Sequence, residues 1–113
     1  MPAKAGISQL PRDTGRMRRG GWVYMMTNRR DGLIYTGVTA YLAARVDQHR
    51  HDRGSKFCRK YGLKTLVLAE PYDTIGEAIT REKRLKAWKR EWKVRLIEES
   101  NPEWRDLFDL ITD

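Results

Sequence analysis

Two short strand-like runs separated by a turn constrain the fold of this chain more than any other feature. Residues 22–27 are rich in aromatic and apolar side chains, and residues 33–38 form a similar run on the other side of the polar segment 28–32. That segment ends in Asp31-Gly32, and an Asp-Gly step between two such runs is a strong hairpin signal. The sequence therefore predicts a β-hairpin over residues 22–38.

After the hairpin, the pattern predicts a helix and then a third strand. Thr39 is placed to cap a helix over residues 40–52, which Gly54 ends. Residues 64–70 contain a run of branched apolar side chains and read as a strand that Pro71 stops.

The last part of the chain reads as helical. Residues 74–100 form a helical region that starts with a capping box between Thr74 and Glu77, and it either runs unbroken or divides near Lys89. After the turn at Asn101-Pro102, residues 103–111 form a short amphipathic helix.

The resulting order is strand, strand, helix, strand, helix, helix (β-β-α-β-α-α). The expected fold class is α/β of the α+β type, with a small antiparallel three-stranded sheet flanked by helices. We expect a basic flexible arm over residues 1–20, the main domain over residues 21–100, and a short C-terminal helix within 101–113 that packs on that domain.

Composition favours a polyanionic partner. The chain has 113 residues and a net charge of +8, and such an excess favours nucleic acid because neutralising phosphates releases counterions. The single cysteine, Cys58, excludes an intrachain disulfide and predicts a reducing, cytoplasmic compartment. No apolar run is long enough to span a membrane.

The charge is distributed unevenly. Residues 81–95 hold eight basic and two acidic side chains, whereas residues 98–113 hold six acidic and one basic. This asymmetry predicts an oriented surface for a phosphate backbone, although a merely solvated helix face explains the basic run equally well. The residues predicted to bind nucleic acid are Arg19, Lys60, Lys86, Lys89, Arg90 and Lys93.

One carboxylate interrupts the apolar stripe of the 74–100 region. Glu82 lies four residues after Ala78 and three before Leu85, on a stripe completed by Ile75, Ile79, Trp88, Trp92 and Leu96. A carboxylate that faces a core is costly unless it is paired or binds a metal. An ion pair with Lys86, one turn on, is the simpler reading, and a metal site is the functional one.

The 40–52 helix repeats this pattern. Leu42 and Val46 form its core-facing pair, while Tyr41, Arg45 and His49 share an adjacent face at steps of four. Arginine there is able to grip a phosphate with two N–H groups. Considered alone, the histidine reads as an ordinary surface residue.

The relative orientation of the two hairpin tyrosines depends on the register of the strands. Tyr24 and Tyr35 share a face if they pair directly, and they point oppositely if the pairing slips by one residue. Strand tyrosines are usually packing residues. Gly37 would allow a backbone or a substrate to approach closely.

These residues in this order resemble the GIY-YIG endonuclease superfamily. The chain looks most like the small, single-domain bacterial members, which are related to the nuclease domain of the excision-repair excinuclease. Trp22-Val23-Tyr24 and Tyr35-Thr36-Gly37 resemble its two naming motifs, and the segments 77–88 and 96–104 resemble its later helices. Trp22 and Thr36 depart from the family name, and no asparagine follows Glu82 at the distance that some members show.

The resemblance implies a divalent-metal-dependent endonuclease of DNA repair or recombination that hydrolyses DNA phosphodiesters by in-line attack of water. It implies Tyr24, Tyr35, Arg45, His49 and Glu82 as catalytic residues, with Glu82 holding Mg²⁺ or Mn²⁺. Tyr24 is expected to act as general base or to orient the water, with its pKa lowered by the nearby cation. Tyr35 and His49 would position the phosphate or relay a proton.

Two alternatives belong to other classes. One is a domain of the same fold that binds nucleic acid without cutting it, which would keep the basic face without needing Glu82 beside Tyr24. A small scaffold protein with incidental basicity is the third reading. A protein partner or a homodimer, needed to choose the target, is a further expectation.

Overall fold

A computed structural model of the chain describes residues 20–111. Its three strands form one antiparallel sheet in the order β2-β1-β3, with β1 in the centre. None of its helices within the described residues is long and apolar enough to cross a membrane. The strands are β1 (Gly21–Thr27), β2 (Ile34–Thr39) and β3 (Thr65–Tyr72).

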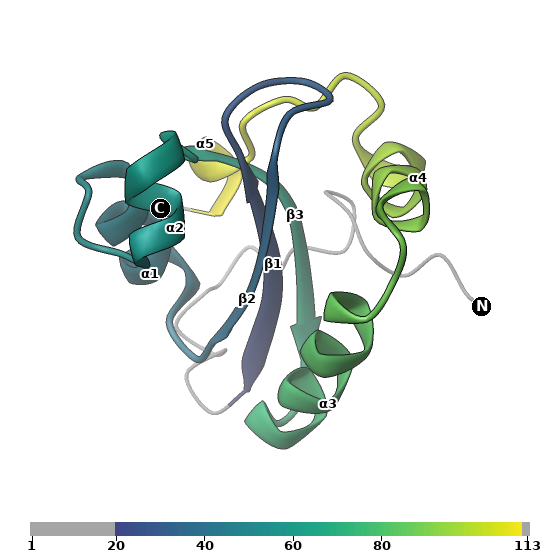
Figure 1. Ribbon diagram of the computed structural model, residues 1–113. Helices are drawn as coiled ribbons and strands as arrows, with labels where there is room; N and C mark the ends of the chain where they lie inside the picture. Colours follow the sequence, from purple (N-terminus) through teal and green to yellow (C-terminus); the bar gives the residue numbers. More distant parts are fainter. Residues whose placement is uncertain (1–19, 112–113) are drawn as a thin grey trace.

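Helices cover both faces of this sheet, as Figure 1 shows. Three of them lie on one face: α1 (Leu42–Arg50), α2 (Lys56–Tyr61) and α5 (Phe108–Ile111). The other face carries α3 (Ile75–Lys86) and α4 (Arg90–Ser100). The expected α+β architecture is confirmed, and the expected elements follow one another in the expected order, with α2 as an additional helix.

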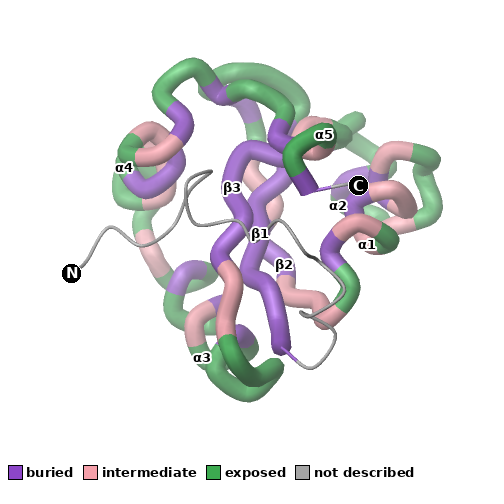
Figure 2. The backbone as a smooth tube through the Cα atoms, turned by 180° about the vertical axis from the view of Figure 1, so that it is seen from behind, coloured by how far each residue is buried: buried purple, intermediate pink, exposed green. Residues whose placement is uncertain are grey.

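The central strand separates two apolar clusters. Every residue of β1 is buried (Figure 2), because helices cover it on both sides. Trp22, Tyr24 and Met26 face the cluster under α1, α2 and α5, whereas Val23 and Met25 face the cluster under α3 and α4. The alternation along one strand thus decides which side chains reach the site described below.

Local signals predict most helix ends correctly, with two corrections. Thr74 and Glu77 form the predicted capping box of α3, and the helical region divides around Lys89, the N-cap of α4. The predicted cap by Thr39 is wrong, because α1 begins at Leu42 and the Thr39 hydroxyl instead accepts from the Tyr41 N–H. The same helix ends at Arg50, before Gly54.

Pro71 does not stop the third strand. It pairs with Trp22 inside β3, which runs on to Tyr72. Because β3 is an edge strand, a residue without an N–H is tolerated there.

Helix α2 is not predicted from the sequence at all. The Ser55 hydroxyl accepts from the Cys58 N–H at its start, and Gly62 ends it in the left-handed conformation at φ 67°. Cys58 is buried in the core, which fixes the orientation of this short helix.

The apolar stripe of the 74–100 region is only partly buried. Ala78, Leu85 and Leu96 lie in the core, but Ile75, Ile79 and Trp92 are each more than a third exposed. The expectation that all of the stripe faces the core is therefore wrong.

The C-terminal segment lies against the domain, where Leu107 and Ile111 enter the cluster of α1 and α2. Asn101 is structural: its side-chain amide donates to the carbonyls of Val67 and Arg105 and accepts from the Arg105 N–H. The predicted basic arm lies outside the described residues, except for residue 20.

Candidate active site

The hairpin register brings the two tyrosines onto one face of the sheet. Tyr24 pairs with Gly37 and Tyr35 pairs with Met26, so the two phenols are offset by two positions and lie diagonally across the strands. Their ring centroids are 6.2 Å apart. The sequence left this register open, and the observed pairing gives the shared face.

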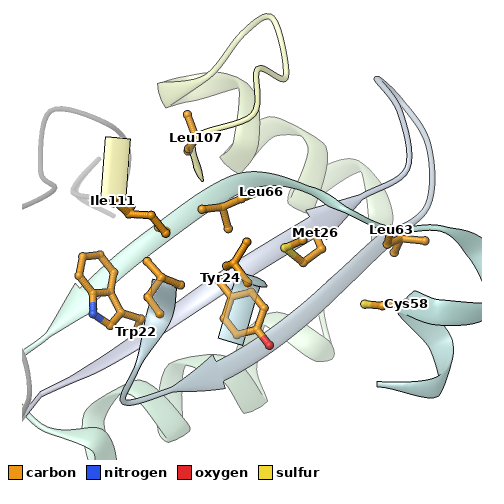
Figure 3. Close-up of a cluster of buried hydrophobic side chains, with 11 residues drawn as sticks. Trp22, Tyr24, Met26, Cys58, Leu63, Leu66, Leu107 and Ile111 are labelled. Carbon is orange, nitrogen blue, oxygen red and sulfur yellow. The ribbon is translucent and has the colours of Figure 1, made fainter. Parts of the chain in front are cut away.

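The position of the Tyr24 ring requires a glycine at residue 37. A Cβ atom at position 37 would fall 2.6 Å from both Cζ and the hydroxyl oxygen of Tyr24. The Tyr24 ring therefore crosses directly over the glycine backbone. Figure 3 shows this ring between Trp22 and Met26, with its hydroxyl turned away from Leu66 and Leu107.

Helix α1 supplies the next two groups. Leu42 and Val46 are buried as expected, and they hold the helix so that His49 faces the tyrosines. The Tyr24 hydroxyl and His49 Nε2 are 2.9 Å apart, and the Tyr35 and His49 ring centroids are 5.4 Å apart. His49 is only 1% exposed, so the reading as a surface histidine is wrong.

Burial decides the protonation of Tyr24. The side chain is fully buried, and desolvation raises the pKa of its phenol well above its ordinary value. Hydrogen bonding to the Arg45 guanidinium lowers that pKa but does not offset the rise. The predicted lowering of the pKa of Tyr24 by a nearby cation is therefore present as the contribution of Arg45, but burial outweighs it.

His49 is neutral at physiological pH. Burial, assisted by the charge of Arg45, lowers the pKa of its imidazole to about 4. The protonated Tyr24 hydroxyl lies 2.9 Å from Nε2, so it is able to donate to the neutral imidazole. The other nitrogen, Nδ1, is buried without a hydrogen-bond partner in the described residues, and Gly54 lies directly against it.

Arg45 joins the two phenols. Hydrogen bonding to Tyr24 is the main cause that raises the pKa of its guanidinium, and Tyr35 contributes in the same direction. Its Nη1 donates to Gln48 Oε1 at 2.9 Å. The guanidinium is partly exposed, so it remains open to an anionic ligand.

Glu82 is buried, as the sequence predicts, but it lies apart from the other four groups. It is 8% exposed on α3, which packs on the opposite face of the sheet from α1. The Glu82 carboxylate and the Lys86 ammonium form an ion pair at 2.5 Å. No hydrogen bond or ion pair joins Glu82 to Tyr24, Arg45 or His49 within residues 20–111.

Glu82 nevertheless lies on the side of α3 that is nearer to β2, the strand that carries Tyr35. Ala78 and Leu85 face the sheet, and Arg81 and Glu82 lie about 50° to opposite sides of that line. Arg81 bonds Glu70 on β3, so Glu82 lies on the side of β2. Since β2 is an edge strand, Glu82 lies toward an edge of the sheet, on the face opposite to the tyrosines.

The donor set at Glu82 fits one kind of metal ion. Lys86 occupies Oε2, and Oε1 forms no hydrogen bond within the described part of the chain. No group of three or more His, Cys, Asp or Glu side chains there is arranged to hold a metal. A single carboxylate suits Mg²⁺ or Mn²⁺, which complete their shells with water and substrate phosphate oxygens.

The predicted nucleic-acid-binding residues divide between the two helical layers. Lys60 is exposed on α2, whereas Lys86 and Lys89 are exposed at the break between α3 and α4. Arg90 donates to the Asp31 carbonyl in the hairpin loop. Burial and the charge of Lys86 lower the pKa of Lys93, which places these two lysines near each other. Arg19 lies outside the described residues.

Two aromatic residues beside the site are not predicted from the sequence. Phe57 stacks on Tyr35 at 6.4 Å between ring centroids, and Tyr61 contacts Phe57 at 5.0 Å. The cap residues Ser55 and Gly62 were the available signal, because they bound a segment that otherwise looks like a loop.

This sheet, its paired tyrosines, its helix-borne arginine and histidine and the buried Glu82 define a small nuclease-type domain. The chain belongs to the GIY-YIG family: the model of the GIY-YIG catalytic domain matches residues 20–95. Relatives named UPF0213 protein, from Staphylococcus aureus strains Mu3, Mu50 and N315, are 39% identical over 69 residues, which is 61% of this chain and 84% of theirs. No solved structure matches the chain significantly.

Proposed function

We propose that this protein is a divalent-metal-dependent endonuclease that hydrolyses DNA phosphodiesters by in-line attack of water, in repair or recombination. The observation that carries the proposal is the convergence of Tyr24, Tyr35, Arg45 and His49 beside the edge of β2. Glu82 lies on the side of α3 next to that edge. The cytoplasmic location stays a prediction from the single cysteine.

We assign the role of each side chain from how far it is exposed to solvent. Tyr35 is partly exposed and takes the position next to the attacking water, because a group that acts on water must reach it. Arg45 neutralises the charge that builds on the non-bridging phosphate oxygens. Tyr24 is buried and protonated, so it and His49 hold the guanidinium and the Tyr35 ring in place.

Glu82 would hold the metal ion. When bound, Mg²⁺ or Mn²⁺ polarises the phosphate and stabilises the leaving oxygen. Lys86 pairs with the same carboxylate, and its ammonium would swing to the DNA backbone when the ion binds.

The test replaces Glu82. Glu82→Gln keeps the shape of the side chain and should lower metal-dependent cleavage of plasmid DNA by at least about a hundredfold, with DNA affinity largely unchanged. Glu99→Ala, at an exposed acid on α4, is the matched control and should cut normally. Cutting by Glu82→Gln at the wild-type rate would refute the metal assignment.

The non-catalytic alternative makes the opposite prediction. A module that only binds nucleic acid retains salt-sensitive DNA binding and gives no product with or without EDTA. A scaffold protein with incidental basicity shows no salt-sensitive DNA binding at all.

A further inference from the structure

Helix α2 presents a row of aromatic rings that begins at the candidate site. Tyr35 and Phe57 are stacked with an interplanar angle of 25°, and Phe57 leads on to Tyr61. Phe57 is 41% exposed and Tyr61 is 43% exposed. Nothing in the described residues covers these rings, so part of each faces solvent.

The surroundings of this aromatic row are positively charged. Lys56, Arg59 and Lys60 are exposed on α2, and none of them forms a salt bridge within residues 20–111. The Lys60 ammonium lies 5.2 Å from the centre of the Tyr61 ring. The sequence has no acidic residue between Asp52 and Glu70.

The fold holds these rings in place without needing them for its core. Cys58 anchors α2 to the cluster beneath it, while Phe57 and Tyr61, four residues apart, share the outer face. Single-stranded nucleic acids bind to surfaces of this kind, because their bases stack on exposed aromatic rings and their phosphates pair with the neighbouring cations. Bases inside a duplex are covered by their neighbours in the stack, so stacking on these rings needs a base that is unpaired or at a duplex end.

We propose that Phe57 and Tyr61 form a stacking platform for an unpaired nucleobase next to the phosphate held by Arg45 and Tyr35. The substrate class is then DNA with an unpaired nucleotide at the cut, in a single strand or at the end of a duplex. This inference rests on the proposed function for the place of the phosphate. The platform itself is a binding surface and can be tested without cleavage.

The test measures binding in EDTA, so that no metal-dependent cutting occurs. Fluorescence anisotropy follows a labelled oligo-deoxythymidine of about 12 nucleotides and the same strand with abasic sugars in place of its bases. Phe57→Ala and Tyr61→Ala should each weaken binding of the normal strand by about five-fold or more. They should leave binding of the abasic strand unchanged, because its charge is the same.

Further variants separate stacking from folding and from charge. Phe57→Leu keeps an apolar contact with Tyr35 and should bind as weakly as Phe57→Ala, whereas Phe57→Trp should bind at least as tightly as the wild type. Trp92→Ala removes an exposed aromatic ring on the opposite face and should have no effect. Lys60→Gln should weaken both strands equally and reduce the salt dependence.

The outcomes distinguish the two proposals. Equal affinity of the wild type for the normal and abasic strands, or an equal loss in Trp92→Ala, would overturn the platform even if the protein cuts DNA. Ring-dependent binding by a protein that cuts no DNA under any metal condition would support the platform and overturn the nuclease.

Discussion

The two faces of the sheet both enclose polar side chains, but they satisfy them to different degrees. Under α3, the Glu70 carboxylate accepts from Arg81 Nε and Nη2 and from the Tyr72 hydroxyl. Under α1, His49 has one nitrogen bonded to Tyr24 and the other without a partner in the described residues. The first arrangement is complete by itself, whereas the second leaves bonding capacity unused.

The electrostatic consequences of the two clusters also differ. Burial, with the charge of Glu70, raises the pKa of Tyr72 to about 12 inside a compensated ion pair. Burial lowers the pKa of His49 to about 4 in a cluster whose charge comes from Arg45. The closed network, formed by Glu70, Arg81 and Tyr72, has all its charges paired and stabilises the fold. The open network, formed by Tyr24, His49 and Arg45, has unused bonding capacity and a partly exposed cation, so a ligand can gain binding energy there. Four changes test this contrast.

The largest effect is expected where the closed network is broken. Arg81→Met leaves the Glu70 carboxylate, whose side chain is 5% exposed, without its main partner, and it should reduce the free energy of unfolding by about 3–5 kcal/mol. Denaturant titration measures this loss. The double variant Glu70→Gln with Arg81→Met should recover most of it, and a single-variant loss below about 1 kcal/mol would contradict the structural role.

The open network should make the fold sensitive to acid. The unfolded chain protonates His49 near pH 6.5 and the folded chain only near pH 4, so the unfolded state binds more protons in that window. The contribution of neutral His49 to the free energy of unfolding is therefore fully present above about pH 6.5. It falls by about 3 kcal/mol as the pH drops to about 4.

Unfolding curves at several pH values check this acid sensitivity. His49→Gln should flatten the dependence, because it has no group to titrate there. His51→Gln, at an exposed histidine, should keep the wild-type profile. An unchanged slope in His49→Gln would show that another group is responsible.

A smaller effect is expected from crowding the Tyr24 ring. Gly37→Ala places a methyl group 2.6 Å from atoms of a fully buried ring, and it should cost about 1–3 kcal/mol and reduce cleavage per folded molecule. Thr36→Val is the neighbouring control on the other face. Its hydroxyl is buried without a partner in the described residues, so its removal should be neutral or stabilising. Equal losses in both variants would contradict this assignment.

The smallest effect on stability is expected at the link between Glu82 and Lys86. Lys86→Gln should change the free energy of unfolding by less than about 0.5 kcal/mol, because the lysine side chain is 54% exposed. It should lower the Mg²⁺ concentration needed for half-maximal cleavage, since the ammonium competes for the same carboxylate. A raised requirement would show that Lys86 assists the ion instead.

Local chemistry was predictable from the sequence. The hairpin and the capping box of α3 depend on residues close together in the chain, and both were predicted. The break near Lys89 was one of two alternatives that the sequence left open. Helix α2 was missed because six residues give too short a window for a helical period. Pro71 was misread because its tolerance depends on β3 being an edge strand, which emerges only when the sheet is assembled.

The sequence predicted some features of the candidate site residues but not how these residues are arranged. The spacing of α1 put Arg45 and His49 on one face, and burial of Glu82 followed from its place on the stripe. Whether Tyr24 and Tyr35 share a face depended on a register that no local signal determines. The placement of Glu82 on the opposite face of the sheet depended on how α3 packs.

The contact between Gly54 and His49 has a consequence for comparing related chains. A Cβ at position 54 would overlap Nδ1 of the imidazole, so the ring keeps its orientation only while that position lacks a side chain. The two positions should therefore covary among homologues: where the histidine is replaced, the glycine is free to change, and where it is kept, the glycine is kept with it. The residues at these two positions should therefore separate family members in which a histidine lies against the buried tyrosine from those in which it does not.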